Sequence, residues 1–154
     1  MSKYLKLIIS LALPQLAGGL GAFFTITAVD SWFATLVKPS WNPPSWLFGP
    51  VWTFLYVLMG IACYLIWKSD FPRKETLLKL YALQLVLNTL WSPAFFGMKS
   101  PLLGLMVIVP LWAAIILCVI KFKKASPLAS GLMVPYLLWV TFATALNTAI
   151  LMLN

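Results

Sequence analysis

Hydrophobic residues fall into five long runs along this 154-residue chain, separated by stretches that contain proline, glycine, serine or charged residues. A helix that crosses a membrane needs about 20 mainly apolar residues, and each run has roughly that length. Three of the four links are short, which favours antiparallel neighbours in one compact bundle. The pattern predicts an all-α membrane protein, a single domain over residues 1–154 with five transmembrane helices. We expect them at about residues 5–27, 48–67, 76–96, 102–122 and 128–152.

The remaining link, about residues 28–47, is longer and different in character. Three of the eight tryptophans and four of the eleven prolines lie between Lys38 and Tyr56. Proline fixes φ and has no N–H to donate, and the Pro43-Pro44 pair favours stiff, extended backbone. Because proline is tolerated in the first turn of a helix, Phe48-Gly49-Pro50 is expected to begin the second helix. We therefore expect residues 28–47 to form a stiff loop, the lid loop, that covers a flat and hydrophobic molecule.

Basic residues are divided unevenly between the two ends of the expected bundle. Nine of the eleven lie at the N-terminal side, counting the second and fourth links, and only Lys38 and Lys99 lie at the other. Since cytoplasmic loops carry the excess of lysine and arginine, we expect a multi-pass protein of the cell membrane with its N-terminus in the cytoplasm. The lid loop and the C-terminus are then on the outer side. The first run continues to Val29, longer than a signal-peptide core of about 7–15 residues, and is interpreted as a retained span.

The composition argues against most classes of enzyme and against an ordinary soluble domain. Hydrophobic residues make up 62% of the chain and charged residues 9%, against about 25% charged in soluble domains. Without histidine there is no Ser-His triad and no histidine ligand for zinc, and no metal site is expected. The net charge of +8 suits the anionic surface of membrane lipid rather than nucleic acid. What the composition favours is binding rather than conventional catalysis.

Polar and aromatic residues recur at helical spacing in three of the runs. Polar side chains in a membrane normally face the interior of the bundle, so these stripes are expected to converge there. An apolar cavity with a few polar groups describes a small-molecule pocket, here for a flat molecule such as a tetrapyrrole, a sterol or a polycyclic drug. The stripes comprise Trp52 and Tyr56 in the second run, Gln84, Asn88, Trp91 and Ser92 in the third, and Trp139, Ala143 and Asn147 in the fifth.

Two alternatives stay open at this point. The interior amides could bond only to one another or to backbone, as packing contacts between helices. Tryptophans such as Trp32 could be anchors at the membrane interface.

The first run also contains small residues at helical spacing. Gly18 and Gly21 belong to small-residue pairs that permit close helix approach, either within one protomer or in a dimer.

Four spaced motifs together resemble the TspO/MBR family, the tryptophan-rich sensory protein and translocator protein family, also called peripheral-type benzodiazepine receptors. The motifs are Lys38-Pro39-x-Trp41-x-Pro43-Pro44, Phe48-x-x-x-Trp52-x-x-Leu55-Tyr56, Gln84-x-x-x-Asn88-x-x-Trp91 and Trp139-x-x-Phe142-Ala143-x-x-x-Asn147. The similarity covers nearly the whole chain. It implies five membrane helices, homodimers, no obligatory cofactor and a pocket open toward the loop between the first two helices.

The resemblance also implies ligands: protoporphyrin IX, haem, sterols and benzodiazepine-site drugs. Residues 145–154 contain neither tyrosine nor a basic residue, so the proposed sterol motif of animal members is absent. Carried onto this chain, the implied ligand-binding residues are Trp32, Pro43, Pro44, Trp52, Tyr56, Asn88, Trp91, Trp139, Ala143 and Asn147.

Four functions are compatible with these features. The first is a membrane receptor or sensor for porphyrins and drugs, and the second is a passive carrier of tetrapyrroles or other flat hydrophobic molecules. The third is light-dependent porphyrin breakdown, in which Trp52 and Trp139 would act as oxidisable indoles and so as catalytic residues. The fourth is a structural subunit whose aromatic residues only pack.

Overall fold

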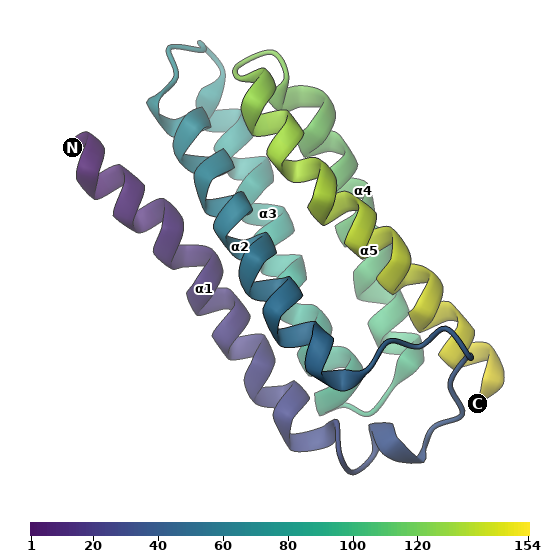
Figure 1. The fold of residues 1–154 in the computed structure, drawn as a ribbon. Helices are drawn as coiled ribbons and strands as arrows, with labels where there is room; N and C mark the ends of the chain where they lie inside the picture. Colours follow the sequence, from purple (N-terminus) through teal and green to yellow (C-terminus); the bar gives the residue numbers. More distant parts are fainter.

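The computed structural model describes all residues, 1–154, and its regular elements are all helical. Five long helices lie side by side in one bundle, with both chain ends and the lid loop at its two extremities (Figure 1). The all-α fold class expected from the sequence is confirmed. The elements are α1 (Lys3–Ala28), the short 3-10 helix η1 (Phe33–Thr35), α2 (Ser45–Lys68), α3 (Lys74–Ser92), the π-helical turn η2 (Pro93–Gly97), α4 (Pro101–Phe122) and α5 (Pro127–Leu153).

Helix α3 differs from the other four in its suitability for a membrane. By length and composition, α1, α2, α4 and α5 are apolar enough to span one, whereas α3 is not. Its first turns carry Lys74, Glu75 and Lys79. Gln84, Asn88 and Ser92 lower its hydropathy further, although they are buried against other helices. The outward face of α3 carries Leu83 and Val86, both more than half exposed, so lipid still meets apolar side chains.

Two helix ends differ from the expected positions by three residues or more, and proline explains both. Helix α2 begins at Ser45, three residues earlier than expected, since Pro44 stands in extended conformation before it and its carbonyl accepts the Leu47 N–H at 3.0 Å. Helix α3 ends at Ser92, because Pro93 has no N–H to continue the ladder. The chain widens there into η2, where the Met98 N–H donates across five residues to Pro93 O at 2.8 Å.

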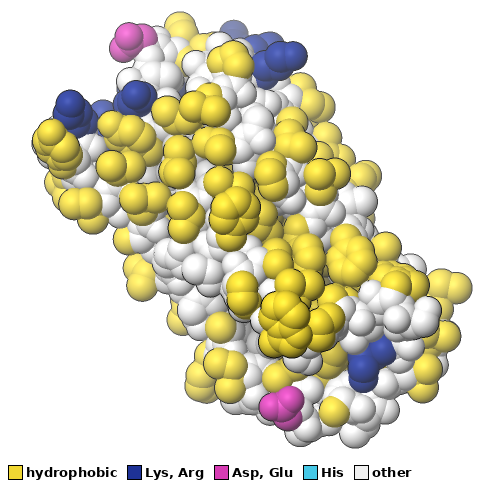
Figure 2. Space-filling model, in the orientation of Figure 1, with side chains coloured by type: hydrophobic (Ala, Val, Ile, Leu, Met, Phe, Trp, Pro, Cys, Tyr) yellow, Lys and Arg dark blue, Asp and Glu magenta, His cyan; other side chains and the backbone are white.

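The core is divided into two clusters of buried side chains. The larger lies toward the lysine-rich links and includes Met59, Ile66, Ile115 and Phe122, all 0% exposed. The smaller lies at the lid end and consists of Ala28, Phe33, Phe95, Phe96, Leu146 and Ile150. Figure 2 shows hydrophobic side chains over most of the face in view, with the charged groups gathered near its two ends. This distribution suits a bundle embedded in hydrocarbon.

Gly18 and Gly21 of α1 make their close helix contacts within the protomer. A Cβ on Gly18 would collide with the Tyr56 ring of α2, and one on Gly21 would touch Ser92 of α3. Deeper along the same pair of helices, a Cβ on Gly60 would lie 2.7 Å from the Ser10 carbonyl oxygen. Glycine at these positions therefore permits the close approach of α1 to α2 and α3.

The lid loop is attached to the far side of the bundle. Its Val37 N–H donates to Asn154 Oδ1 at 3.0 Å, and Asn154 Nδ2 donates back to Val37 O at 2.8 Å. The Trp41 ring meets Phe142 of α5 edge-on, with centroids 5.5 Å apart. The loop thus crosses the end of the bundle from α1 to α5 before it enters α2 (Figure 1).

Candidate ligand-binding cavity

A cavity of about 500 Å³ lies between the two core clusters. All five long helices contribute to its wall, together with η1 and η2, and most of the lining residues are hydrophobic. Pockets for small molecules typically measure about 300–1,000 Å³ and combine apolar walls with a few polar groups. The cavity has the size and character of such a pocket.

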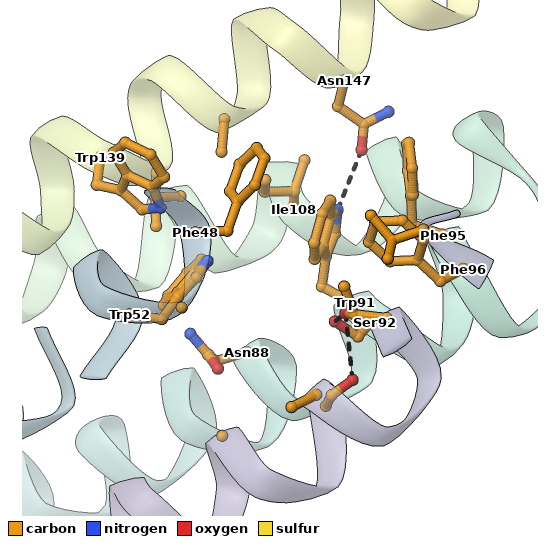
Figure 3. A pocket seen from close by; sticks show the side chains of 18 of the residues that line it. Phe48, Trp52, Asn88, Trp91, Ser92, Phe95, Phe96, Ile108, Trp139 and Asn147 are labelled. Atoms are coloured by element: carbon orange, nitrogen blue, oxygen red, sulfur yellow. Dashed lines mark hydrogen bonds between the residues drawn. The ribbon is translucent and has the colours of Figure 1, made fainter. Parts of the chain in front are cut away.

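Trp52 of α2 and Trp139 of α5 form one end of the cavity (Figure 3). Their ring centroids are 6.4 Å apart and their planes nearly perpendicular, at 88°. Trp52 also stacks on Tyr56 at 5.5 Å, and Phe48 meets Trp139 edge-on at 6.0 Å. Contacts of these kinds are the favoured aromatic geometries, so the two indoles are held in fixed positions.

A second aromatic group forms the other end, around Trp91 of α3 (Figure 3). Trp91 stacks on Phe95 with centroids 5.1 Å apart and meets Phe96 edge-on at 5.8 Å. Its indole N–H donates to Asn147 Oδ1 at 3.1 Å, and Asn147 Nδ2 donates to Pro101 O at 2.8 Å. The position of this tryptophan is therefore fixed by both stacking and hydrogen bonding.

One fully buried polar atom of the lining residues has no partner. Trp139 Nε1 is buried and makes no hydrogen bond. A buried donor without an acceptor costs about 1–3 kcal/mol. A ligand that placed a carbonyl, carboxylate or ring nitrogen beside this N–H would remove that cost.

The structure brings together seven of the ten residues expected at the site. These seven line the cavity: Trp52, Tyr56, Asn88, Trp91, Trp139, Ala143 and Asn147. The other three do not. Trp32 packs outside the lining, edge-on to Phe95 at 5.6 Å, and the Pro43-Pro44 pair ends one residue before Ser45, which does line it.

Sequence reasoning missed part of the wall. Phe95 and Phe96 fall at the end of an expected transmembrane run and receive no role from the motifs, although Phe95 follows Trp91 at a spacing of four, a signal that could have found it. No site residue was named on helix α1, yet seven of its residues, several of them small, line the wall. Tyr136, which lies behind the wall at 0% exposure, was also missed because a tyrosine inside an apolar run has no distinctive spacing.

The exposed part of the cavity wall extends further than the expected opening toward the loop. The resemblance implied an opening toward the loop, and the exposed lining residues lie on α1 and α2, along the seam between these helices. Gln15 Nε2 bridges this seam to Thr53 O at 3.4 Å. Lateral access therefore extends from the lid end well into the part of the bundle that lipid surrounds. The exposed lining residues are Gln15, Gly19, Ala22, Ile26, Ser45, Gly49 and Thr53.

An all-helical membrane bundle with an aromatic interior cavity is the class of protein that the fold and the cavity define. The sequence profile of the TspO/MBR family matches residues 10–153, and the chain belongs to this family. It is 47% identical to the tryptophan-rich protein TspO of Chlorobaculum tepidum, over 97% of this chain and 96% of that protein. It is 41% identical to the tryptophan-rich sensory protein of Cereibacter sphaeroides, over 81% of this chain and 78% of the relative.

The human translocator protein is 40% identical to this chain, over 87% of the chain and 81% of the human protein. The recognition of the family from its motifs is confirmed. Together with the apolar helices, family membership shows a multi-pass membrane protein.

Proposed function

We propose that this protein is a membrane receptor or sensor that binds porphyrins, such as protoporphyrin IX and haem, and drugs of the benzodiazepine-site class. The observation that carries the proposal is the pair of indoles, Trp52 and Trp139, which meet at one end of an interior cavity of about 500 Å³ instead of facing lipid. One relative is named a sensory protein and another a translocator protein.

The chemistry of the cavity favours a flat, mainly apolar ligand. Aromatic rings at both ends offer stacking and edge contacts to a planar macrocycle, and the apolar wall accepts its hydrocarbon periphery. The unpaired Trp139 N–H offers one hydrogen bond to a polar substituent. The lining contains no histidine, cysteine or carboxylate, and the Tyr56 hydroxyl is bonded to Asn88 Oδ1. We therefore propose that haem is recognised mainly through its ring.

Tryptophan fluorescence tests the proposal directly. Protoporphyrin IX should quench the emission saturably in lipid nanodiscs, and a benzodiazepine-site drug should compete. Trp139→Phe should weaken binding, whereas Trp112→Phe should not, because Trp112 lies outside this cavity with its N–H on Thr141 Oγ1 at 2.9 Å. Linear, unsaturable quenching of the wild type would overturn the proposal and favour a purely structural protein.

A passive carrier is the second candidate, and the lateral opening between α1 and α2 favours it. A membrane-dissolved molecule could enter the cavity through this seam without crossing the lid loop. Flux of protoporphyrin IX in sealed proteoliposomes separates the two functions. A carrier accelerates equilibration across the bilayer, whereas a receptor binds without changing its rate.

Light-dependent porphyrin breakdown is a further activity that the same indoles would support. A photoexcited porphyrin in contact with Trp52 or Trp139 could take an electron from the indole, with dioxygen as the terminal oxidant. The test is bleaching of protoporphyrin IX under illumination in air, compared at equal occupancy. Equal bleaching by wild type and the double variant Trp52→Phe/Trp139→Phe would remove this activity and leave binding intact.

We also propose an N-terminus in the cytoplasm of a cell-membrane homodimer, with the lid loop outside. The excess of basic residues at the N-terminal side of the bundle supports the orientation. Labelling of single cysteines introduced at Ser40 and at Ser126 with an impermeant reagent tests it in intact cells. Labelling of the cysteine at 126 but not of the one at 40 would reverse the orientation, and cross-linking in membranes would test the dimer.

A further inference from the structure

Four polar side chains form a continuous hydrogen-bonded chain beside the cavity. The Tyr56 hydroxyl donates to Asn88 Oδ1 at 3.0 Å, and Asn88 Nδ2 donates to the Tyr136 hydroxyl at 2.8 Å. The Tyr136 hydroxyl in turn donates to Gln84 Oε1 at 2.8 Å. Tyr56 and Asn88 line the cavity, whereas Tyr136 and Gln84 lie behind them at 0% exposure.

The direction of this chain is set at its buried end. Gln84 Nε2 faces the thioether sulfur of Met59 at 3.9 Å. A thioether can accept a hydrogen bond but has none to donate, so it holds the nitrogen of the Gln84 amide. The amide oxygen must then face Tyr136 and accept its only hydroxyl hydrogen.

Each later orientation follows from the one before it. Because Tyr136 has given its hydrogen to Gln84, its oxygen can only accept from Asn88, and this orients the Asn88 nitrogen toward it. The Asn88 oxygen is thereby turned to Tyr56, whose hydrogen it receives. Tyr56 is left with a free acceptor lone pair and no free donor.

We propose that Gln84 and Tyr136 are positioning residues, which never touch the ligand but fix the orientation of the Asn88 amide and so the polarity of the cavity wall. This rests on the proposed function and extends it. At this wall a ligand meets an acceptor at Tyr56, whose ring stacks on Trp52, and the buried, unpaired donor of Trp139, whose ring meets Trp52 edge-on. The matching ligand class is a flat molecule with a ring N–H or O–H donor and a separate acceptor such as a carbonyl or carboxylate.

The chain of residues offers a matched control in Tyr81. This tyrosine is also buried, at 3% exposure, and belongs to the same core cluster as Tyr136. Its hydroxyl makes no hydrogen bond. Tyr136→Phe and Tyr81→Phe therefore each remove one hydroxyl oxygen from similar surroundings, but only the first variant interrupts the hydrogen-bonded chain through Asn88.

The first readout requires no ligand. In protein labelled with [15N]asparagine in nanodiscs, the Asn88 side-chain amide signal is identified by its loss in Asn88→Leu. Tyr136→Phe and Gln84→Met should shift this signal, and Tyr81→Phe should leave it in place. An unmoved signal in Tyr136→Phe would overturn the inference whether or not porphyrin binds.

The second readout is the affinity for protoporphyrin IX, measured by tryptophan quenching. Tyr136→Phe should weaken binding about tenfold, Tyr81→Phe by less than about twofold, and Tyr136→Phe should cost nothing further when added to Asn88→Leu. An undiminished loss in the Asn88→Leu background would show that Tyr136 acts by packing, against the inference. Absence of saturable binding to the wild type would instead defeat the proposed function, while the amide signal still tests the orientation.

Discussion

The two halves of this bundle are built from the same helices but packed in opposite ways. Toward the lysine-rich links, the interior is filled by residues such as Ala62, Cys118 and Met133, all 0% exposed. Toward the lid loop, α2 and α5 carry Trp52 and Trp139 instead, and a cavity of about 500 Å³ remains between them.

Side-chain shape accounts for this difference. Small and flexible side chains interdigitate to close packing, whereas large rings anchored by edge and stacking contacts cannot collapse into the space they enclose. Close packing in the filled half therefore contributes most of the stability of the fold. The hollow half keeps its shape without close packing, because its aromatic rings hold one another in place. The two halves should therefore respond differently to substitution.

The largest effect on stability is expected in the filled half. Phe122→Ala removes a ring that is 0% exposed and should lower the free energy of unfolding by about 3 kcal/mol, the lower end for such truncations. The loss is mainly of packing, since lipid is as apolar as the core. Equilibrium unfolding in detergent measures it. Trp139→Phe should lose less than half as much stability while it weakens porphyrin binding, and equal losses would contradict the comparison.

The second effect concerns affinity rather than stability. Ala143 lies in the wall of the cavity, so Ala143→Phe should fill part of the hollow. We expect protoporphyrin IX affinity to fall about 100-fold, or about 2.7 kcal/mol, with the unfolding midpoint unchanged or raised. The matched control is Ala113→Phe on the exposed face of α4. Retained affinity in Ala143→Phe would place the ligand elsewhere.

The sequence predicted the filled and hollow halves to different extents. Every helix was found, because an apolar run of about 20 residues matches the thickness of a membrane and is rare in any other setting. On α5, Trp139, Ala143 and Asn147 were correctly placed on one face by their spacing of four. Positions in the lid loop were harder to predict from the sequence. Trp32, Pro43 and Pro44 lie outside the lining, because tertiary contacts such as that of Val37 with Asn154 determine the path of the loop.

The remaining omissions have local causes. Helical periodicity fails in η2, where the hydrogen bond at Pro93 spans five residues, so periodicity did not assign Phe96 to the cavity, and Phe95 could be found only by its spacing of four from Trp91. The hydrogen-bonded chain through Tyr136 depends on three helices meeting, which one run of sequence does not encode. The lateral opening depends on how far α1 lies from α2, a distance that no spacing in either helix predicts.

The third effect tests the lateral opening through its kinetics. Gly19 lines the seam, and a Cβ there meets nothing within 4 Å. Gly19→Trp should therefore fold, but it should obstruct entry and slow porphyrin association about tenfold. Stopped-flow quenching measures this rate. Gly131 of α5 is equally open and does not line the cavity, so Gly131→Trp is the control. Unchanged association in Gly19→Trp would mean that ligands enter past the lid loop.

The smallest effect concerns a single hydrogen bond between α1 and α3 beside the hollow half. The hydroxyl oxygens of Thr25 and Ser92 lie 3.1 Å apart, and interhelical bonds of this kind are worth about 0.6 kcal/mol on average in membrane proteins. Ser92→Ala should therefore lower the unfolding free energy by roughly that amount, with porphyrin affinity within about twofold of wild type. Thr25→Val should act similarly, and the double variant should lose less than the sum because both substitutions delete one bond. A loss above about 2 kcal/mol for Ser92→Ala would mean that the hollow half depends on polar contacts for its stability, rather than on the mutual support of its aromatic rings.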